Sequence, residues 1–333
     1  MAQIKVAVIG LGSAAQLIHL PILHKMPNVK VIAACEINKN RLKTVADKFS
    51  IENRYTNYEE LLAADTTDAV IITTPTSSHK EVALRAMEKG IPVFIEKPVA
   101  RNFAEAKAIA DYSISKGVPV MVGMNLRFRP DIQLLKSMIK TKQINDIFYI
   151  RSSWYKPQSS ESVWFSKREE AGGGVIFDLG IVLLDLVLWL LDFPEISTVS
   201  CTNYHHNTKN VEDSSISHIR CANGATIVTE SSWSMRPEKN SFALDIYAKD
   251  GSATLNPFRV FKKNKGIDEE ITLPRNDNMT ALFSKSYNNE LKLFIDAVRG
   301  INAFYSSVTE AVERMKVIEA MYKSAEAGKE IKI

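Results

Sequence analysis

Lys97 is the residue whose type and place in the sequence best fit proton-transfer chemistry. It follows an apolar segment, Pro92 to Ile95, in the tripeptide Glu96-Lys97-Pro98. A lysine at the end of a buried strand can bridge a bound cofactor and a substrate hydroxyl, and Pro98 can fix the turn, a cis bond being one way to do so. The alternative is a surface lysine in a salt bridge. The strand-end position favours chemistry, with Glu96 assigned to the same site.

Two acids interrupt the most apolar segment of the chain, Val175 to Leu191. Asp178 and Asp185 are spaced two helical turns apart, which predicts that they share one face of a helix with Val182 between them. The segment is short for a membrane span, and charges at that depth in lipid are costly. We expect a buried helix with two functional acids. A pair of buried carboxylates bonded to backbone is the structural alternative.

A glycine-rich turn follows the first apolar run, Ile4 to Ile9. Gly10 allows a tight turn out of the strand, Gly12 lets backbone approach a pyrophosphate, and Ala15 leaves room for the next helix, whose N–H groups point at the phosphates. The turn is preceded by a strand and followed by a helix and a second strand, which is the context that the motif requires. The sequence therefore predicts a dinucleotide site, to which the remaining turn residues are also assigned: Leu11, Ser13 and Ala14.

An acid ends the second predicted strand, Val29 to Cys35. Glu36 at this place can accept hydrogen bonds from the adenosine ribose hydroxyls and repels a 2′-phosphate, which favours NAD over NADP. Lys39 and Arg41 follow closely and could soften that repulsion, so NADP stays possible; alternatively, both are solvated charges at a helix start. Arg41 is included among the cofactor residues.

A run of hydroxyl side chains, Thr73 to His79, follows another apolar segment. Its backbone and hydroxyls can line the dinucleotide, and Thr74, Pro75 and His79 are assigned to that wall. The alternative is an N-cap cluster in which Ser77 or Ser78 caps the next helix. Both interpretations can hold together.

Strand and helix patterns alternate through residues 1–124, which predicts a doubly wound parallel α/β domain with ligands at the carboxyl ends of its strands. The pattern changes at Asn125. Residues 125–333 carry longer alternating strands, with Asn223-Gly224 as a hairpin signal, and predict an α+β domain with a large, open, mostly antiparallel sheet. Helices are expected at Tyr287 to Arg299 and Val308 to Ala327, both returning to the first domain.

Composition narrows the class of protein. The chain has 333 residues, 45% of them hydrophobic, and a formal net charge of +4 with no basic block of the nucleic-acid-binding type. The three cysteines, Cys35, Cys201 and Cys221, are far apart and indicate neither a disulfide framework nor a metal site. The first strand begins too early for a signal peptide. We therefore expect a cytoplasmic protein that binds neither nucleic acid, membrane nor metal.

Taken in order, these segments resemble the glucose–fructose oxidoreductase / inositol dehydrogenase / MocA family. The resemblance rests on G-L-G-S-A-A, His19-Leu20-Pro21, T-T-P-T-S-S-H, E-K-P, N-L-R-F-R-P, G-G-G-V-I-F-D-L-G-I, E-D-S-S-I-S-H-I-R-C-A-N-G-A and S-Y-N-N-E-L-K-L-F-I-D-A-V. It implies NAD(P)-dependent oxidation or reduction of a sugar, cyclitol or related polyol. It also implies a homodimer or homotetramer that packs through the open face of the large sheet.

Residue roles follow from the matched motifs. Lys97 matches the lysine of E-K-P, and Asp178 and Asp185 match the first and last acids of the family pattern D-x-G-x-H-x-x-D. The resemblance places Asp178 with Lys97 in catalysis. It places Asn125, Arg127, Tyr155, Val182 and Asp185 at the substrate and Trp164 at the cofactor, and Trp154 and Arg168 on segments that border the cleft.

The chain departs from the family at the histidine that usually exchanges the substrate proton, which is Val182 here. A positioned proton-transfer group contributes roughly 10²–10⁴ in rate, and valine supplies none of it. Three explanations stay open: another group serves, Lys97 first and Tyr155 second; the protein binds NAD with little or no dehydrogenase activity, as a regulatory or accessory protein; or it retains NAD for a transient oxidation within a lyase, glycosidase or epimerase reaction.

Overall fold

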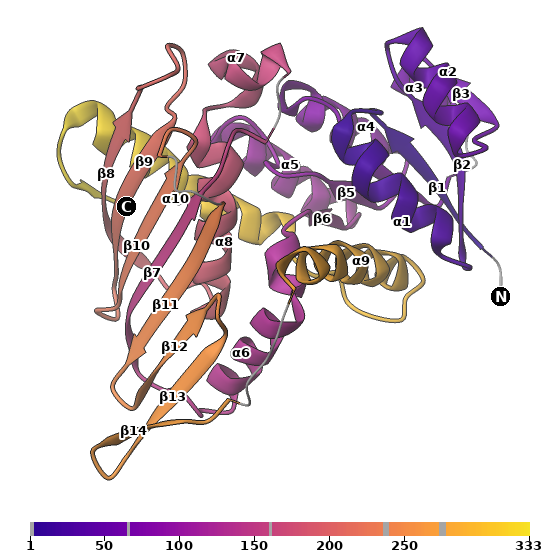
Figure 1. Ribbon diagram of the computed structural model, residues 1–333. Coiled ribbons are helices and arrows are strands. Elements are labelled where there is room, and N and C mark those ends of the chain that lie inside the picture. Colours follow the sequence, from indigo (N-terminus) through magenta and orange to yellow (C-terminus); the bar gives the residue numbers. More distant parts are fainter. Residues whose placement is uncertain (1–2, 65–66, 160–161, 236–239, 273–277) are drawn as a thin grey trace. The chain divides into compact units, whose positions relative to one another are not determined.

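The computed structural model describes residues 3–64, 67–159, 162–235, 240–272 and 278–333 (Figure 1). The chain forms two compact units. Unit 1 comprises Met1–Asn125, Glu169–Gly172 and Tyr287–Val312, and unit 2 comprises Leu126–Arg168, Gly173–Ser286 and Glu313–Ile333. The first crossing lies beside the boundary expected at residue 124. Two later segments belong to unit 1, and the last helix contributes to both units instead of returning wholly to the first.

Unit 1 contains a six-stranded parallel sheet in the order β3-β2-β1-β4-β5-β6. Its strands are β1 (Ile4–Ile9), β2 (Val29–Cys35), β3 (Asn53–Tyr55), β4 (Ala69–Ile72), β5 (Val93–Ile95) and β6 (Val120–Val122). Its helices include α1 (Leu20–Lys25), α2 (Lys39–Lys48), α3 (Tyr58–Ala63), α4 (His79–Glu88) and α5 (Phe103–Lys116). The expected doubly wound domain is confirmed.

The central strands β1 and β4 of this sheet are buried over most of their length. Val6, Ala7 and Val8 in β1 have no exposed surface, and every residue of β4 is likewise covered. Strands covered on both faces need continuous apolar runs, which is why β1 and β4 could be read from the sequence. Because all strands are parallel, the segments that follow β1, β2, β4 and β5 leave the sheet at one edge.

Unit 2 contains a nine-stranded sheet in the order β14-β13-β12-β11-β7-β10-β9-β8-β15. Its neighbours pair antiparallel except β7 and β10, which are parallel. The strands are β7 (Ile147–Tyr155), β8 (Ile196–Tyr204), β9 (Ser214–Cys221), β10 (Thr226–Ser232), β11 (Ser241–Ala248), β12 (Gly251–Leu255), β13 (Arg259–Asn264), β14 (Ile267–Glu270) and β15 (Ile331–Lys332). The expected large sheet is confirmed, with β9 and β10 joined at the predicted Asn223-Gly224 turn.

Helix α8 (Ile181–Leu190) packs on β7 and β10 in the sheet of unit 2 (Figure 1). The stretch Arg168–Leu190 is apolar enough to cross a membrane by composition, but 94% of its most apolar window is buried inside the protein. Protein atoms therefore cover its apolar side chains, as expected for a core helix. The remaining helices are α6 (Pro130–Lys140), α7 (Arg168–Ala171), α9 (Met279–Val298) and α10 (Val308–Ala327).

Two expected helices differ in detail. Helix α9 begins at Met279 instead of Tyr287. The helix expected from Val175 opens with a π-helical turn, Ile176–Gly180, before α8. A π-turn holds more residues than an α-turn, so the spacing from Asp178 to Asp185 is no longer two regular turns. The two acids have separate sets of partners, as described below.

Buried charged side chains hold both ends of the helix that carries the two acids. At its amino end, Glu212 Oε1 accepts hydrogen bonds from the N–H groups of Gly174 (2.9 Å) and Ile176 (3.0 Å). At its carboxyl end, Lys136 Nζ donates to the carbonyls of Trp189 (2.7 Å) and Leu190 (3.1 Å). A carboxylate at the amino end and an ammonium at the carboxyl end both oppose the helix dipole.

The glycines before this helix are required by close packing around Glu212. A Cβ on Gly174 would lie 2.0 Å from the Glu212 carbonyl oxygen, and one on Gly173 would lie 1.9 Å from the Tyr322 hydroxyl. That hydroxyl donates to the same Glu212 oxygen at 2.8 Å. The glycine triplet therefore lets three donors converge on one buried carboxylate.

Replacement of Glu212 by glutamine should change how stability depends on pH. Burial raises the pKa of Glu212, although its hydrogen-bond donors partly offset the effect. A carboxyl group with a raised folded-state pKa favours folding when it is protonated, and this contribution is lost as pH rises. Relative to Glu212→Gln, the wild-type free energy of unfolding should therefore fall as pH rises above about 4, the usual pKa of a glutamate carboxyl group.

Urea denaturation of both proteins across this range measures the difference. Glu313→Gln, at an exposed position of α10, is the matched control and should show no such trend. A difference between wild type and Glu212→Gln that is independent of pH would contradict the assignment.

Candidate functional site

The glycine turn of unit 1 has the backbone geometry that the motif predicts. Gly10 has a φ of +91°, and a Cβ there would lie 2.7 Å from the Thr74 backbone nitrogen. Only glycine accepts that conformation and that approach. At Gly12 a Cβ would meet no protein atom within 4 Å. Protein packing therefore explains Gly10 but not Gly12, whose open backbone fits the close approach of a phosphate.

The helix after this turn begins with a π-helical segment, Ala15–His19, and continues as α1. π-turns are rare and occur often at functional sites. Another such turn, Ile176–Gly180, contains Asp178. In the glycine turn, Leu11 is buried and Ser13 is exposed, so the two side chains point to opposite sides of the turn.

Glu36 lies against the glycine turn and is almost fully buried. Its Oε2 accepts the Leu11 N–H at 3.0 Å and its Oε1 accepts the Asn38 N–H at 2.9 Å. Arg41 Nη1 lies 3.3 Å from the first of these oxygens. The carboxylate is therefore at the end of β2, where a ribose would be bound, but it already accepts three protein donors. The Arg41 guanidinium is half exposed and faces this carboxylate.

The Thr74–His79 loop is also tied to the glycine turn. Thr73 Oγ1 donates to the Gly10 carbonyl at 2.7 Å, and Ser78 Oγ donates to Thr74 Oγ1 at 2.8 Å. The loop forms a short 3₁₀ turn, Thr76–Ser78, and neither Ser77 nor Ser78 caps α4 through its side chain. The N-cap alternative is therefore wrong, because this turn leads directly into the helix.

His79 is completely buried, and both ring nitrogens contact backbone carbonyls. Nδ1 lies 2.9 Å from the Pro98 oxygen and Nε2 lies 2.9 Å from the Thr74 oxygen. Burial lowers the pKa of His79, with a smaller opposing effect of these carbonyls. The imidazole thus joins the Thr74 loop to the turn after β5.

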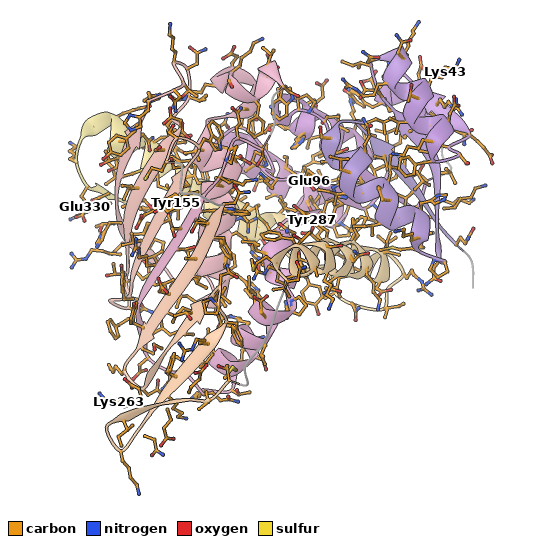
Figure 2. All side chains as sticks on the ribbon, in the orientation of Figure 1. Lys43, Glu96, Tyr155, Lys263, Tyr287 and Glu330 are labelled. Carbon is orange, nitrogen blue, oxygen red and sulfur yellow. The ribbon has the colours of Figure 1, made fainter. Side chains whose placement is uncertain are left out.

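Glu96, Lys97 and Pro98 follow β5 at the same edge of the sheet, and the Lys97–Pro98 bond is cis. Figure 2 labels Glu96, whose Oε1 lies 2.6 Å from His19 Nε2 and whose Oε2 accepts the Lys97 N–H at 3.0 Å. The chain thus brings the glycine turn, Glu36, Thr74 and Lys97 to one edge of the parallel sheet of unit 1.

Asp178 is buried in the π-turn of unit 2. Its Oδ2 accepts hydrogen bonds from Trp233 Nε1 at 3.0 Å and from the Ser159 N–H at 3.1 Å. Val182 lies one turn further along, is 3% exposed, and follows the first residue of α8. An apolar side chain thus lies at the position for which the family resemblance implies a histidine.

Asp185 is bound by two buried arginines. Arg127 donates from Nε (2.7 Å) and Nη2 (2.6 Å), and Arg314 Nη1 lies 2.6 Å from Oδ1. The Arg127 guanidinium also lies over the rings of Trp189 and Phe193. All three charged side chains are at most 3% exposed. The structure brings Arg127 and Asp185 together, while Asp178 has different partners.

Tyr155 ends β7 on unit 2 and is labelled in Figure 2. Its hydroxyl donates to Glu230 Oε2, and Arg151 Nε donates to the other oxygen at 2.9 Å. Burial, reinforced by Glu230, raises the pKa of Tyr155 to about 12. Trp164 lies in a 3₁₀ turn of unit 2, and its ring packs edge-on against Phe165. Asn125 is buried and is the last residue of the first segment of unit 1.

Several partners were not assigned from the sequence. Trp233 and Ser159 bind Asp178, Glu230 binds Tyr155, and His19 binds Glu96. The motif His19-Leu20-Pro21 pointed to His19 as a family residue, but nothing in the sequence predicted its contact with Glu96. Among the residues that the structure describes, no group of three or more histidine, cysteine and acidic side chains could hold a metal ion.

Comparison with known proteins identifies both halves of the chain. Residues 4–124 match the oxidoreductase family with an NAD-binding Rossmann fold, GFO/IDH/MocA, and residues 132–254 match the C-terminal domain of the same family. The chain belongs to this family. The resemblance drawn from the motifs is thereby confirmed, and the protein is a member of a family of NAD-binding oxidoreductases.

Individual relatives are similar along most of their length. D-glucoside 3-dehydrogenase of Escherichia coli is 24% identical over 99% of this chain and 97% of its own. The scyllo-inositol 2-dehydrogenase (NAD(+)) of Bacillus subtilis is 28% identical over 89% of this chain and 86% of its own. A levoglucosan dehydrogenase solved in complex with NADH has a TM-score of 0.89 at 21% identity, covering 99% of each chain, and shows the shared fold.

Gly12→Val should strongly weaken dinucleotide binding without unfolding the protein. No protein atom lies within 4 Å of the added Cβ, so the melting temperature should stay close to that of the wild type. The valine side chain would instead occupy the space of a pyrophosphate, and the NAD dissociation constant should rise at least about 100-fold, or about 2.7 kcal/mol.

Titration calorimetry with NAD and thermal unfolding together measure the two effects. Ala108→Val, at an exposed position of α5, controls for the added side chain. Unchanged NAD affinity in Gly12→Val would contradict the assigned phosphate site.

Proposed function

We propose that the protein transfers a hydride between NAD and a hydroxyl-bearing or carbonyl carbon of a sugar, cyclitol or related polyol. The observation that carries the proposal lies within unit 1. The open Gly12 backbone and Lys97 follow two parallel strands of one sheet and therefore leave it at the same edge. The D-glucoside and inositol specificities in the names of the relatives support the substrate class.

The cofactor supplies the hydride-transfer chemistry, and the chain supplies binding and orientation. In this proposal the pyrophosphate binds at Gly10 to Ala14 and the adenosine ribose at Glu36. Thr74 and Pro75 line the dinucleotide, and His79 holds their loop from behind. Trp164 is retained as a contact of the cofactor on the basis of the family resemblance alone.

Glu36 supports NAD as the preferred cofactor. A carboxylate that accepts N–H groups from Leu11 and Asn38 is held as an acceptor, and it would repel a 2′-phosphate. Arg41 could attract that phosphate, but its Nη1 already lies 3.3 Å from Glu36. The NAD(+) and NADH in the descriptions of two relatives point in the same direction.

Lys97 is proposed as the group that orients the reacting oxygen and exchanges its proton. In the reducing direction its ammonium donates a proton to the carbonyl oxygen; in the oxidising direction its neutral amine accepts the hydroxyl proton. Tyr155 is a weaker candidate, because its hydroxyl donates to Glu230 and its pKa is raised. Water then restores the protonation state of Lys97.

Asp178 is proposed to orient the substrate hydroxyl or Lys97. Its carboxylate is fixed by Trp233 and Ser159, which hold one oxygen in a set direction. Arg127 and Asp185 neutralise each other, which supports a role in fixing the helix beside the substrate rather than in exchanging protons. Asn125 and Val182 are retained as lining residues of the substrate site.

A second function is favoured by Val182 itself. A dehydrogenase without the family's histidine has lost one established proton carrier, so a protein that binds NAD and turns over little or nothing is the alternative. NAD retained for a lyase, glycosidase or epimerase reaction is a third case. A fluorescence screen with NAD or NADP and a panel of inositols, aldoses, uronic acids and their keto forms, in both directions, separates them. Tight NAD binding without turnover would favour the regulatory interpretation.

The proposed partners are a small-molecule substrate and further copies of this chain. The open face of the large sheet exposes Ile216 and Tyr247, and Tyr247 stacks on Tyr149 across β7 and β11. Exposed apolar side chains on this face of the sheet support a homodimer or homotetramer. We place the protein in the cytoplasm, which fits three free, buried cysteines.

NAD should bind more tightly than NADP. The buried Glu36 carboxylate would face the 2′-phosphate of NADP, and the repulsion between two adjacent negative charges typically costs several-fold or more in affinity. Parallel calorimetric titrations with both cofactors measure the ratio, and Glu36→Gln should reduce it. Equal affinities in the wild type would contradict this preference.

Lys97→Met should lower turnover by about 10²–10⁴-fold while the NAD dissociation constant changes little. Methionine keeps the unbranched side chain but cannot hold a proton. Initial rates on the best substrate of the screen, with NAD titrations, measure both quantities. Lys89→Met, at an exposed position of unit 1, is the matched control. Wild-type turnover in Lys97→Met would exclude Lys97 as the proton carrier.

Val182→His should raise turnover on a simple polyol. An imidazole at this place would restore the missing proton carrier and could recover part of the about 10²–10⁴-fold that such a group contributes. Val182→Phe adds a ring of similar size without a basic nitrogen and separates chemistry from changes in shape. If histidine and phenylalanine change the rate alike, the substrate of this protein sits differently from that of its relatives.

A further inference from the structure

Glu212 and Asp213 hold both partners of the hydrogen bond between Trp233 and Asp178. The first two residues lie directly before β9, and Trp233 lies directly after β10. The first residue of β9 is paired with the last residue of β10, and this ladder continues by one bond, since the Trp233 N–H donates to the Asp213 carbonyl at 2.7 Å. Strand pairing thus fixes the backbone of Trp233.

Glu212 fixes the other partner through the backbone that precedes Asp178. Its Oε1 accepts the N–H groups of Gly174 (2.9 Å) and Ile176 (3.0 Å), and its carbonyl accepts the N–H of Val175 at 2.9 Å. One residue therefore accepts three successive N–H groups. The Gly174 carbonyl in turn accepts the Asp178 N–H at 3.1 Å. The backbone of Asp178 is thus only two hydrogen bonds away from Glu212.

Together these contacts form a closed ring of hydrogen bonds. One side runs from Glu212 through Gly174 to Asp178, and the other runs from Asp213 to Trp233. Trp233 Nε1 closes the ring by donating to Asp178 Oδ2 at 3.0 Å. The side chains of this ring belong to buried residues, of which Trp233 is the most exposed at 8%. Because water cannot easily replace buried hydrogen bonds, breaking one of them is costly.

Apolar packing sets the orientation of the Trp233 ring. The ring lies in a small apolar cluster whose other buried members are Val175, Leu179 and Val211. The Phe165 ring lies against it, with the two ring centroids 5.9 Å apart. An indole has a single N–H donor, so the orientation of the ring decides where that donor points. Packing of the ring therefore sets the direction from which Asp178 is bound.

We propose that Glu212 and Trp233 are positioning residues for Asp178: Glu212 fixes the backbone of the π-turn, and Trp233 fixes the direction of the Asp178 carboxylate. Relevance to turnover rests on the proposed function, which places Asp178 in catalysis. The hydrogen bond itself can be observed without a substrate or a cofactor.

The indole N–H of Trp233 is the direct probe of this contact. The chain has four tryptophans, so protein labelled with ¹⁵N in the indole rings gives four N–H signals in an NMR spectrum. Trp233→Phe identifies the signal of Trp233. A hydrogen bond to a carboxylate moves the proton signal downfield and slows exchange of the proton with solvent. Both quantities are measured on the folded, full-length protein, and thermal unfolding is recorded for every variant.

Glu212→Met and Glu212→Gln form a matched pair. Methionine keeps the unbranched side chain but removes the acceptor for Gly174 and Ile176, whereas the amide oxygen of glutamine can still accept both N–H groups. In Glu212→Met the Trp233 signal should move upfield, and its exchange should become at least about tenfold faster, because hydrogen bonds to charged acceptors are strong. Glu212→Gln should stay close to the wild type. An unmoved Trp233 signal in Glu212→Met would overturn the role of Glu212.

Lys136→Met separates positioning from a general loss of stability. Lys136 binds carbonyls at the other end of the same helix, so its replacement should also lower the melting temperature. The Trp233 signal should nevertheless stay in place, while the signal of Trp189, whose ring centroid lies 5.2 Å from Lys136 Nζ, should move. Equal movement of the Trp233 signal in both methionine variants would overturn the proposal, because a loosened helix would then explain it.

Two milder variants keep the test decisive if Glu212→Met does not fold. Glu212→Asp is too short to reach both N–H groups and should move the Trp233 signal upfield; no movement would count against Glu212. Asp178→Ala removes the acceptor and should shift the same signal, and an unchanged signal would overturn the role of Trp233. A protein that shows these shifts but turns over no substrate would support the positioning and count against the oxidoreductase function, so the two can fail separately.

Discussion

The charge of Asp185 must be compensated in the middle of the most apolar helix of the chain. Burying an ionised carboxylate there without partners would cost more free energy than the net folding stability of a domain. Two buried arginines bind it, one of them through a bidentate contact. That requirement fixes α8 in rotation, because Asp185 must face Arg127 and Arg314, and it thereby fixes where Val182 and Asp178 point.

The same helix is fixed lengthwise by charges at its two ends. Glu212 binds N–H groups at the amino end, and Lys136 binds carbonyls at the carboxyl end. These contacts come from β9 and its preceding loop and from α6, which are distant in sequence. The apolar helix is thus held in register by two buried charged side chains, one at each end. Such precision matters where a reacting group must be placed to a fraction of an ångström.

Much of this architecture was readable from the sequence because it depends on local patterns. The buried strands β1, β2 and β4, the glycine turn and the Asn223-Gly224 hairpin each carry their signal within a few residues. The π-turns at Ala15–His19 and Ile176–Gly180 do not, because one extra residue per turn leaves no mark in an apolar pattern. Pairings such as Glu96 with His19 or Asp178 with Trp233 depend on tertiary folding, and no spacing along the chain predicts them.

Because residue 182 is a valine, the residue that exchanges a proton with the substrate must be sought elsewhere, and unit 1 offers one. In unit 2 the described side chains that could carry a proton already have partners. The Tyr155 hydroxyl donates to Glu230, and Asp185 pairs with Arg127 and Arg314. Asp178 accepts two hydrogen bonds on one oxygen. In unit 1 the strand end after β5 carries a lysine beside a carboxylate held by a buried histidine. The carboxylate accepts the Lys97 N–H and so fixes the backbone from which the lysine side chain extends. A proton carrier on this strand end would serve the reaction in both directions, because the group that gives a proton to a carbonyl oxygen is the one that takes it from the hydroxyl in reverse.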